Sequence, residues 1–469
     1  MIDDLHYLEL TELAACIKTG EISPPEVTRA QLARIAALDG ELGSYVHVMA
    51  ESAMAQAEAA QAEIAAGRYR GPLHGVPIAL KDLFWTKGYP TAAGTVVHRN
   101  YRPDHDASVV RRLNEAGAVV LGKLQLTEGA YSDHHPSVTP PKNPWHADYW
   151  PGISSSGPAV ATAAGLCYGA LASDTGGSIR WPCAANGLTG LKPSWGRVSR
   201  YGMFELAATL DHVGPIARSA ADAGAMLGVI AGSDPKDPTA LLDPLPDYLA
   251  GAEQDIQGLR IGLDATWNGD GVDGAVQQVL ANAMDALRAL GADIVEVRFP
   301  DVKQAVTDWV LNCAVEAAVA HETTYPARKN EYGPVLASVL DTGRALSGVD
   351  YQRILLRRLE LRGQVASLFE TIDLLLMPVH PFAPLTLATI RTLGEQPELI
   401  ARLQQYTCPF DMTGHPTITL PGGFSAAGLP IAFQLVAANL DEATLVRAAA
   451  AFQRTTPWHR HHPSLASWR

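Results

Sequence analysis

Three short segments of the chain carry residue types that could act together on a carbonyl group. Lys81 follows a short apolar run, Ser154 lies in the hydroxyl-rich stretch 151–158, and Ser178 ends the glycine-rich stretch 173–178. A serine hydroxyl is a poor nucleophile without a base, and a lysine can act as a base only while it is neutral. Burial would lower the pKa of Lys81 by disfavouring its ammonium form. These residues therefore predict nucleophilic catalysis by a serine.

Each segment also has a plainer structural interpretation. Lys81 could extend from a strand end into solvent, as most lysines do. A serine of the 151–158 stretch could cap the helix that follows, and another serine could still be catalytic. Gly176 and Gly177 let the backbone turn its N–H groups toward one point, which suits an oxyanion or a phosphate. The pattern of a phosphate-binding P-loop is absent, so we favour the oxyanion.

Other catalytic chemistries fit the sequence less well. The histidines of 133–135 and of 459–462 lack the HExxH spacing of zinc hydrolases, so we expect no metal. His134 or His135 is instead a candidate to line a substrate cleft. A Ser-His-Asp hydrolase would need a GxSxG elbow, whereas the loop at 152–157 reads GISSSG. The combination of two serines and a lysine remains.

The order and spacing of the three segments resemble the amidase signature family. Further stretches agree with it, from about residue 7 to residue 454: Thr91–Thr95, Asn143–Trp145, Gly190–Pro193, Asp211–Pro215, Gly414–Pro416 and Leu420–Phe424. The resemblance implies an amidase, a hydrolase acting on carbon–nitrogen bonds other than peptide bonds, with no cofactor. This sequence departs from the commoner family pattern at Ile153 and Ser156, which replace glycines, and at Pro158, which replaces a serine.

Matching positions imply a role for each residue. Ser178 would be the nucleophile and Lys81 the base and later the proton source. Ser154, preceded by a cis peptide bond, would pass the proton between them. The oxyanion hole would use the backbone N–H groups of Thr175, Gly176, Gly177 and Ser178. We expect Ala130, Tyr131 and Ile153 to contact the substrate. Aromatic residues of 305–345 and 378–412 are either pocket or core: Trp309, Tyr325, Phe382, Tyr406 and Phe410.

The chain alternates between predicted strands and helices, which indicates an α/β protein. The resemblance implies a mixed, twisted central β-sheet surrounded by α-helices. We expect one domain over 1–469, with a helical part at 1–66, a catalytic core at 67–230 and the rest of the sheet with the pocket segments at 231–469. The hydrophobic pattern predicts a small-residue helix at 159–169, a helix at 272–290, strands at 76–80, 119–122, 259–263, 292–297 and 373–377, and a hairpin of 417–421 with 430–436.

The composition of the chain disfavours two classes of partner, nucleic acids and anionic membranes. The net charge of −13 over 469 residues disfavours nucleic acids and anionic membranes. The five cysteines are scattered without a CxxC pair, which is typical of a reducing compartment. The start lacks a signal-peptide pattern, and the near-apolar stretch 159–172 is too short to span a bilayer. We therefore expect a cytoplasmic protein.

Three functions remain to be compared. The first is a stand-alone amidase, which could form a homodimer, acting on small amides with an apolar or aryl acyl group, with carbamate (urethane) or ester cleavage also possible. The second is the glutaminase subunit of a tRNA-dependent amidotransferase, whose SSNLARYDG-like stretch is missing from 312–332. The third, a non-catalytic binding relative, is disfavoured because Lys81, Ser154 and Ser178 are all present.

Overall fold

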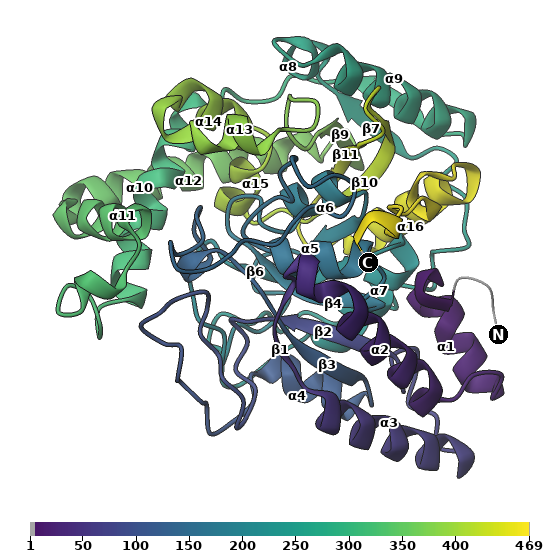
Figure 1. Cartoon of the computed structure of the whole chain (residues 1–469). Helices are drawn as coiled ribbons and strands as arrows, with labels where there is room; N and C mark the ends of the chain where they lie inside the picture. The colour runs from purple at the N-terminus through teal and green to yellow at the C-terminus, as the bar shows by residue number, and fades with distance from the viewer. Residues whose placement is uncertain (1–4, 469) are drawn as a thin grey trace.

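A single mixed sheet of eleven strands runs through the computed structural model, which describes residues 5–468 (Figure 1). The strand order is β1-β3-β2-β4-β6-β5-β10-β11-β9-β7-β8. The strands are β1 (Tyr45–Val48), β2 (Pro77–Lys81), β3 (Val119–Leu124), β4 (Gly169–Asp174), β5 (Thr189–Lys192), β6 (His212–Ala217), β7 (Arg260–Leu263), β8 (Asp293–Glu296), β9 (Leu374–Pro378), β10 (Thr417–Phe424) and β11 (Pro430–Ala437).

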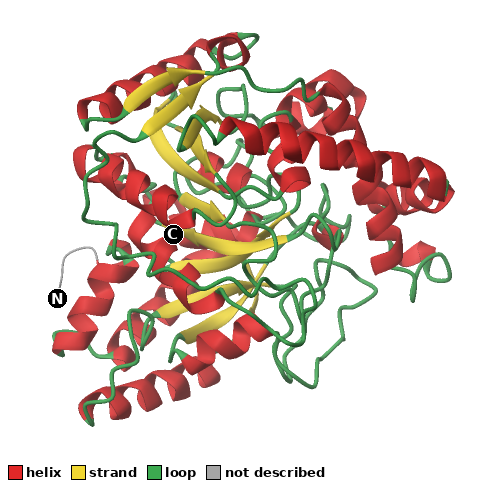
Figure 2. Ribbon diagram, turned by 180° about the vertical axis from the view of Figure 1, so that it is seen from behind, coloured by secondary structure: helices red, strands yellow, loops and turns green. Residues whose placement is uncertain are grey.

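Helices surround this sheet, as Figure 2 shows, and confirm the expected fold class. They are α1 (Leu10–Thr19), α2 (Pro24–Leu42), α3 (Ala50–Ala65), α4 (Ser108–Glu115), α5 (Ser156–Ala163), α6 (Arg180–Asn186), α7 (Ala220–Ile230), α8 (Ala265–Gly269), α9 (Gly274–Ala289), α10 (Lys303–Ala320), α11 (Pro334–Ala345), α12 (Gly348–Leu368), α13 (Leu387–Arg391), α14 (Pro397–Gln404), α15 (Cys408–Thr413) and α16 (Glu442–Thr455). Among the helices described, none is long and apolar enough to cross a membrane.

The central strands are buried on both faces. Leu171 packs into the main core, which also contains residues of α7, whereas its neighbour Ala172 packs with Ala159 and Cys183 of α5 and α6. Successive residues of a strand point to opposite faces, so helices cover both sides of β4. β2 pairs in parallel with both β3 and β4. Parallel neighbours end at the same edge of a sheet, and this brings the ends of β2 and β4 together.

Two predicted elements differ from the structure. The N-terminal part is not purely helical, because Tyr45–Val48 forms the edge strand β1, antiparallel to β3. Its Tyr-Val-His-Val sequence favours a half-buried strand over a helix. The helix predicted at 159–169 begins earlier, at Ser156, and ends at Ala163, because Gly169 already belongs to β4 between β2 and β6. The predicted hairpin is confirmed as β10 and β11.

Candidate active site

Lys81 is the last residue of β2, and none of its side chain is exposed. Its Nζ atom lies 2.7 Å from Ser154 Oγ, 2.9 Å from Ser155 Oγ and 2.9 Å from Ser173 Oγ. Ser173 belongs to β4, so the shared edge of the two parallel strands supplies one of these contacts. Lys81 does not extend to solvent. It is held inside the protein by three hydroxyl groups.

The surroundings of Lys81 favour its neutral form. Burial lowers the pKa of Lys81 to about 7, against the carboxylates of Asp174 and Asp211, which raise it. Asp82, the neighbour in sequence, is not among these opposing charges. Its carboxylate lies 3.0 Å from the Nζ atom of Lys123, with which it forms a buried ion pair.

The loop that carries Ser154 lies against the first turn of α6. The Ile153–Ser154 peptide bond is cis, as the resemblance implies. A Cβ atom on Gly152 would come within 2.4 Å of the Cα atom of Pro182, so only glycine fits there. Ser178 lies four residues before Pro182, in the turn between β4 and α6, and is 7% exposed. The structure thus places the Ser154 loop against α6, the helix that follows the Ser178 turn directly.

The carboxylate of Asp174 organises the Ser178 turn. It accepts the backbone N–H of Gly177 at 2.7 Å and that of Ile179 at 3.0 Å. The Gly177 N–H is therefore already engaged, although we expected it to bind an oxyanion. No acceptor within the described residues 5–468 is assigned to the N–H groups of Thr175, Gly176 or Ser178. Three of the four N–H groups expected to bind an oxyanion therefore have no acceptor in the described part of the chain.

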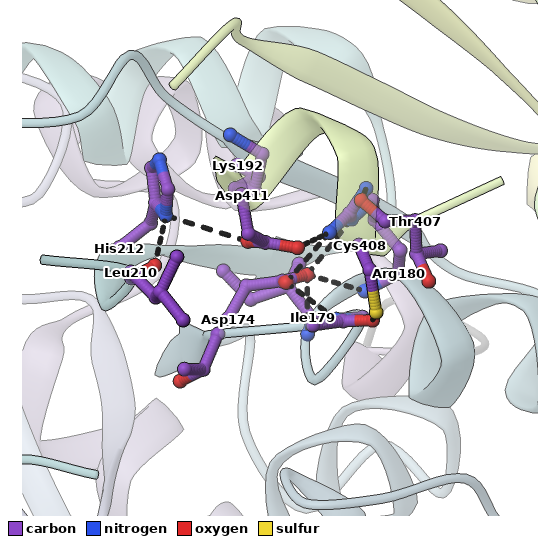
Figure 3. A network of polar contacts seen from close by, with 12 residues as sticks. Asp174, Ile179, Arg180, Lys192, Leu210, His212, Thr407, Cys408 and Asp411 are labelled. Atoms are coloured by element: carbon purple, nitrogen blue, oxygen red, sulfur yellow. Dashed lines mark hydrogen bonds and ion pairs between the residues drawn. The ribbon is translucent and has the colours of Figure 1, made fainter. Parts of the chain in front are cut away.

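A buried ion network lies behind the turn (Figure 3). Arg180 donates two hydrogen bonds to the carboxylate of Asp174, of 2.9 Å from Nε and 2.8 Å from Nη2. It also donates to the carboxylate of Asp411 and to the carbonyl of Thr407. Burial would raise the pKa of Asp174, but the Arg180 guanidinium holds it well below its usual range. Asp411 comes from α15, so the network ties a distant segment to the turn.

The three expected substrate-contact residues come from two segments that adjoin Ser154. Ala130 is buried with a left-handed backbone (φ 59°), and Tyr131 is half-buried. Thr127 of the same segment donates its N–H to the Ser154 carbonyl at 3.4 Å. Ile153 is half-buried and packs into an apolar cluster that includes Trp150, Trp181, Phe382, Leu403, Leu385, Leu387 and Ile390.

The aromatic candidates separate into two groups. Trp309, Tyr325, Tyr406 and Phe410 are buried in the main core. Phe382 packs in the cluster around Ile153. The indole Nε1 of Trp309 donates a 2.7 Å hydrogen bond to the carbonyl of Thr175 in the Ser178 turn.

The histidine clusters have other contacts. His134 Nε2 lies 3.2 Å from the hydroxyl of Ser156, beside the serine loop, and burial lowers its pKa to about 4. His459 lies 3.3 Å from the carboxylate of Glu9. Within the residues that the structure describes, no group of three or more His, Cys, Asp or Glu side chains could hold a metal ion.

A family model described as Amidase matches residues 26–446. This chain belongs to the amidase signature family. It is accordingly a hydrolase of carbon–nitrogen bonds. It is 49% identical over 462 residues to the Mycobacterium tuberculosis protein named "Putative amidase AmiD", covering 98% of this chain and 97% of the relative.

More distant relatives cover the chain as fully. A glutamyl-tRNA(Gln) amidotransferase subunit from Geobacter metallireducens is 37% identical over 482 residues, with 97% of this chain and 99% of the relative covered. A solved bacterial aryl acylamidase, described as a member of the amidase signature enzymes, superposes with a TM-score of 0.87 at 25% identity and covers 98% of each chain.

Sequence reasoning missed three contributors to the amidase site. Ser155 and Ser173 contact Lys81 directly, and both lie in the segments we had singled out. The hydroxyl-rich sequence around Ser155 and Ser173 could have indicated that they contact the lysine. Asp411 carried no such signal, because it lies more than two hundred residues from its partner Arg180 and follows no catalytic motif.

Proposed function

We propose that this amidase hydrolyses small amides with an apolar or aryl acyl group, using Ser178 as the nucleophile. Ser154 relays a proton from Ser178 to Lys81, which is the base. The observation that carries the proposal is the 2.7 Å contact between Lys81 Nζ and Ser154 Oγ, made by a lysine whose pKa burial lowers to about 7. A lysine with that pKa is substantially neutral at physiological pH.

The hydrogen bonds around Lys81 support a relay through Ser154. The Ser155 hydroxyl donates to the Ser173 carbonyl at 3.2 Å, so it accepts from Lys81. A neutral amine has two N–H donors and one lone pair. When its donors serve Ser155 and Ser173, the lone pair faces the hydroxyl proton of Ser154.

The proposed reaction forms and then breaks an ester. Ser178 Oγ attacks the amide carbonyl while its proton passes through Ser154 to Lys81. The N–H groups of Thr175, Gly176 and Ser178 stabilise the oxyanion, and the Gly177 N–H anchors the turn to Asp174. Lys81 returns the proton to the leaving nitrogen by the same path, and water hydrolyses the acyl-enzyme.

The apolar cluster around Ile153 supports the proposed acyl group. Ile153 precedes Ser154 directly, and its neighbours in the cluster include Trp181 and Phe382. A carboxylate or ammonium on the acyl group would lose its hydration against these side chains. The likeness to the solved aryl acylamidase points the same way. Carbamates and esters form acyl-enzymes at the same site, so urethane cleavage belongs to the proposal.

The alternative is the glutaminase subunit of a tRNA-dependent amidotransferase. The relative of 37% identity, which is named as part of such an enzyme, favours it, but the amidase relative at 49% is more similar. Glutamine carries two charges that the Ile153 cluster does not pair.

Initial rates on aryl amides, aliphatic amides, carbamates, esters and glutamine, with Ser178→Ala as the blank, decide between the amidase and the glutaminase subunit. Turnover of glutamine above that of aryl amides would overturn the proposal.

We also propose that residues 1–469 act as one cytoplasmic domain and pair as a homodimer. α12 supports the pairing, because Val349, Leu356 and Leu359 form an exposed apolar stripe one and two turns apart. Arg353 and Glu360 flank that stripe with opposite charges, so two antiparallel copies would pair them across a two-fold axis. Light scattering of the wild type against Leu356→Glu tests it. A monomeric wild type would contradict it.

A further inference from the structure

Trp309 contacts the Ser178 turn in two ways at once. Its indole N–H donates to the Thr175 carbonyl at 2.7 Å. Its ring lies against Gly176, where an added Cβ atom would come within 2.3 Å of ring atom Cζ2. Both contacts act on the single peptide group that joins Thr175 to Gly176, so Trp309 fixes the position and the orientation of that group.

The orientation of this peptide decides where the Gly176 N–H points. Among the described residues, the cis peptide bonds are Ile153–Ser154 and Tyr325–Pro326, so the turn has trans bonds. In a planar trans peptide the C=O and N–H point in opposite directions. Because Trp309 holds the Thr175 carbonyl, the Gly176 N–H points away from the indole.

The next two peptides of the turn are held by other partners. The Gly177 N–H is turned toward Asp174 at 2.7 Å. The Gly177 carbonyl accepts the backbone N–H of Trp181 at 2.8 Å, so the Ser178 N–H points away from α6. With the Thr175 N–H, the Gly176 and Ser178 N–H groups are left to bind an oxyanion, and the Gly176 N–H depends on Trp309.

We propose that Trp309 is a positioning residue for the oxyanion hole, which it acts on through the Thr175–Gly176 peptide. This inference rests on the proposed function, since it assumes that Ser178 attacks a carbonyl. A donor that is already aimed at the developing charge needs no reorganisation in the transition state. Trp309 therefore contributes to kcat and not to the binding of the ground-state substrate.

α10 is anchored firmly enough to hold the indole in place. Asp308, the residue before Trp309, accepts two hydrogen bonds of 2.7 Å from Arg357 of α12. Glu316, two helical turns further on, accepts the Thr209 N–H at 2.7 Å. Both ends of the segment are thus tied to other elements, and the 303–320 helix carries Trp309 as a rigid support.

The test removes the indole N–H and keeps an aromatic side chain at position 309. Trp309→Phe should lower kcat about tenfold or more, because a donor in the hole loses its fixed orientation, and it should change KM less than twofold. A boronic acid, which forms a tetrahedral adduct with the serine, should bind more weakly by the same factor as the loss in kcat/KM. An unchanged kcat, or an unchanged boronate affinity, would overturn the inference.

Two further variants make the result specific. Trp195→Phe removes an indole N–H that has no partner among the described residues, and it should leave kcat unchanged. Benzothienylalanine at position 309 replaces the N–H by sulfur in a ring of the same shape, so it tests the hydrogen bond even where Trp309→Phe fails to fold.

Ser178→Ala, assayed in parallel, separates the proposed function from the proposed role of Trp309. Retained turnover there would refute the function itself, whereas normal kcat in the 309 variants alone would refute only the positioning role.

Discussion

The carboxylate of Asp82 lies 3.0 Å from Lys123 Nζ, and this buried pair keeps it away from Lys81, the residue before it. Consecutive side chains at a strand end project to opposite sides of the sheet, so neighbours in sequence face different partners. The charge on Lys81 is therefore controlled by burial and by the carboxylates of Asp174 and Asp211.

The pH dependence of turnover should follow the protonation of Lys81. Below its pKa of about 7 the amine is an ammonium and accepts no proton, so kcat/KM should fall roughly tenfold per pH unit and level off above that pKa. Rates measured from pH 5 to 9 should give one rising limb, with about a hundredth of the plateau at pH 5. Lys81→Arg should stay inactive at every pH, since a guanidinium does not deprotonate. An acid optimum would remove Lys81 from the mechanism.

Removing the carboxylate of Asp82 should separate stability from catalysis. Asp82→Asn leaves Lys123 buried without its counter-charge, which costs about 3–5 kcal/mol of the free energy of unfolding. The midpoint of the pH profile should stay where it is, because Asp82 is not among the charges that shift the pKa of Lys81. Urea unfolding and the kcat/KM profile, measured on the same preparation, check the two parts. A profile displaced to lower pH would show that Asp82 acts on Lys81 after all.

The three serines of the 154–156 loop should differ sharply in their effect on turnover. Ser154→Ala breaks the proposed relay and should lower kcat by several orders of magnitude, as should Lys81→Ala. Ser178→Ala should abolish turnover with the fold intact. Ser155→Ala removes one contact to Lys81 and should have an intermediate effect.

Ser156→Ala is the matched control for this series, because its hydroxyl contacts His134 and not Lys81. It should keep nearly wild-type kcat. Losses in the Lys81, Ser154 and Ser178 variants should not add in the double mutants, since the three groups act as one unit. Additive losses, or equal losses at all three serines of the loop, would contradict the relay.

Arg180 should contribute strongly to stability, because it pairs with the fully buried carboxylate of Asp174. Arg180→Met leaves Asp174 buried and unpaired, at a cost of about 3–5 kcal/mol in the free energy of unfolding. Arg288→Ala is the comparison, because its pair with Asp285 lies on the exposed face of α9 and should be worth at most about 0.5 kcal/mol. Urea titrations at pH 7 measure both. Equal effects from the two variants would show that burial does not set the value of the Arg180 pair.

Local patterns predicted much of the fold and of the candidate site. Hydrophobic runs located β2, β3, β7, β8 and β9, and a glycine-containing turn located the hairpin of β10 and β11. The edge strand β1 was missed because a four-residue segment between long helices gives too short a pattern. The three catalytic candidates were identified because their segments occur together in an order that resembles the amidase signature family, although each segment alone also has a structural interpretation.

The sequence by itself determined the family and the expected chemistry, because the residue types and their order predict a serine nucleophile, a second serine and a lysine. Only the tertiary structure decided the pKa of the lysine and the contacts that hold the serine turn. Burial and its charged neighbours set the pKa of Lys81, and a residue's burial depends on segments far away in the chain. The contacts that hold the Ser178 turn likewise come from Trp309 of α10 and, through Arg180, from Asp411 of α15, which come close to the turn only when the sheet and its helices have packed.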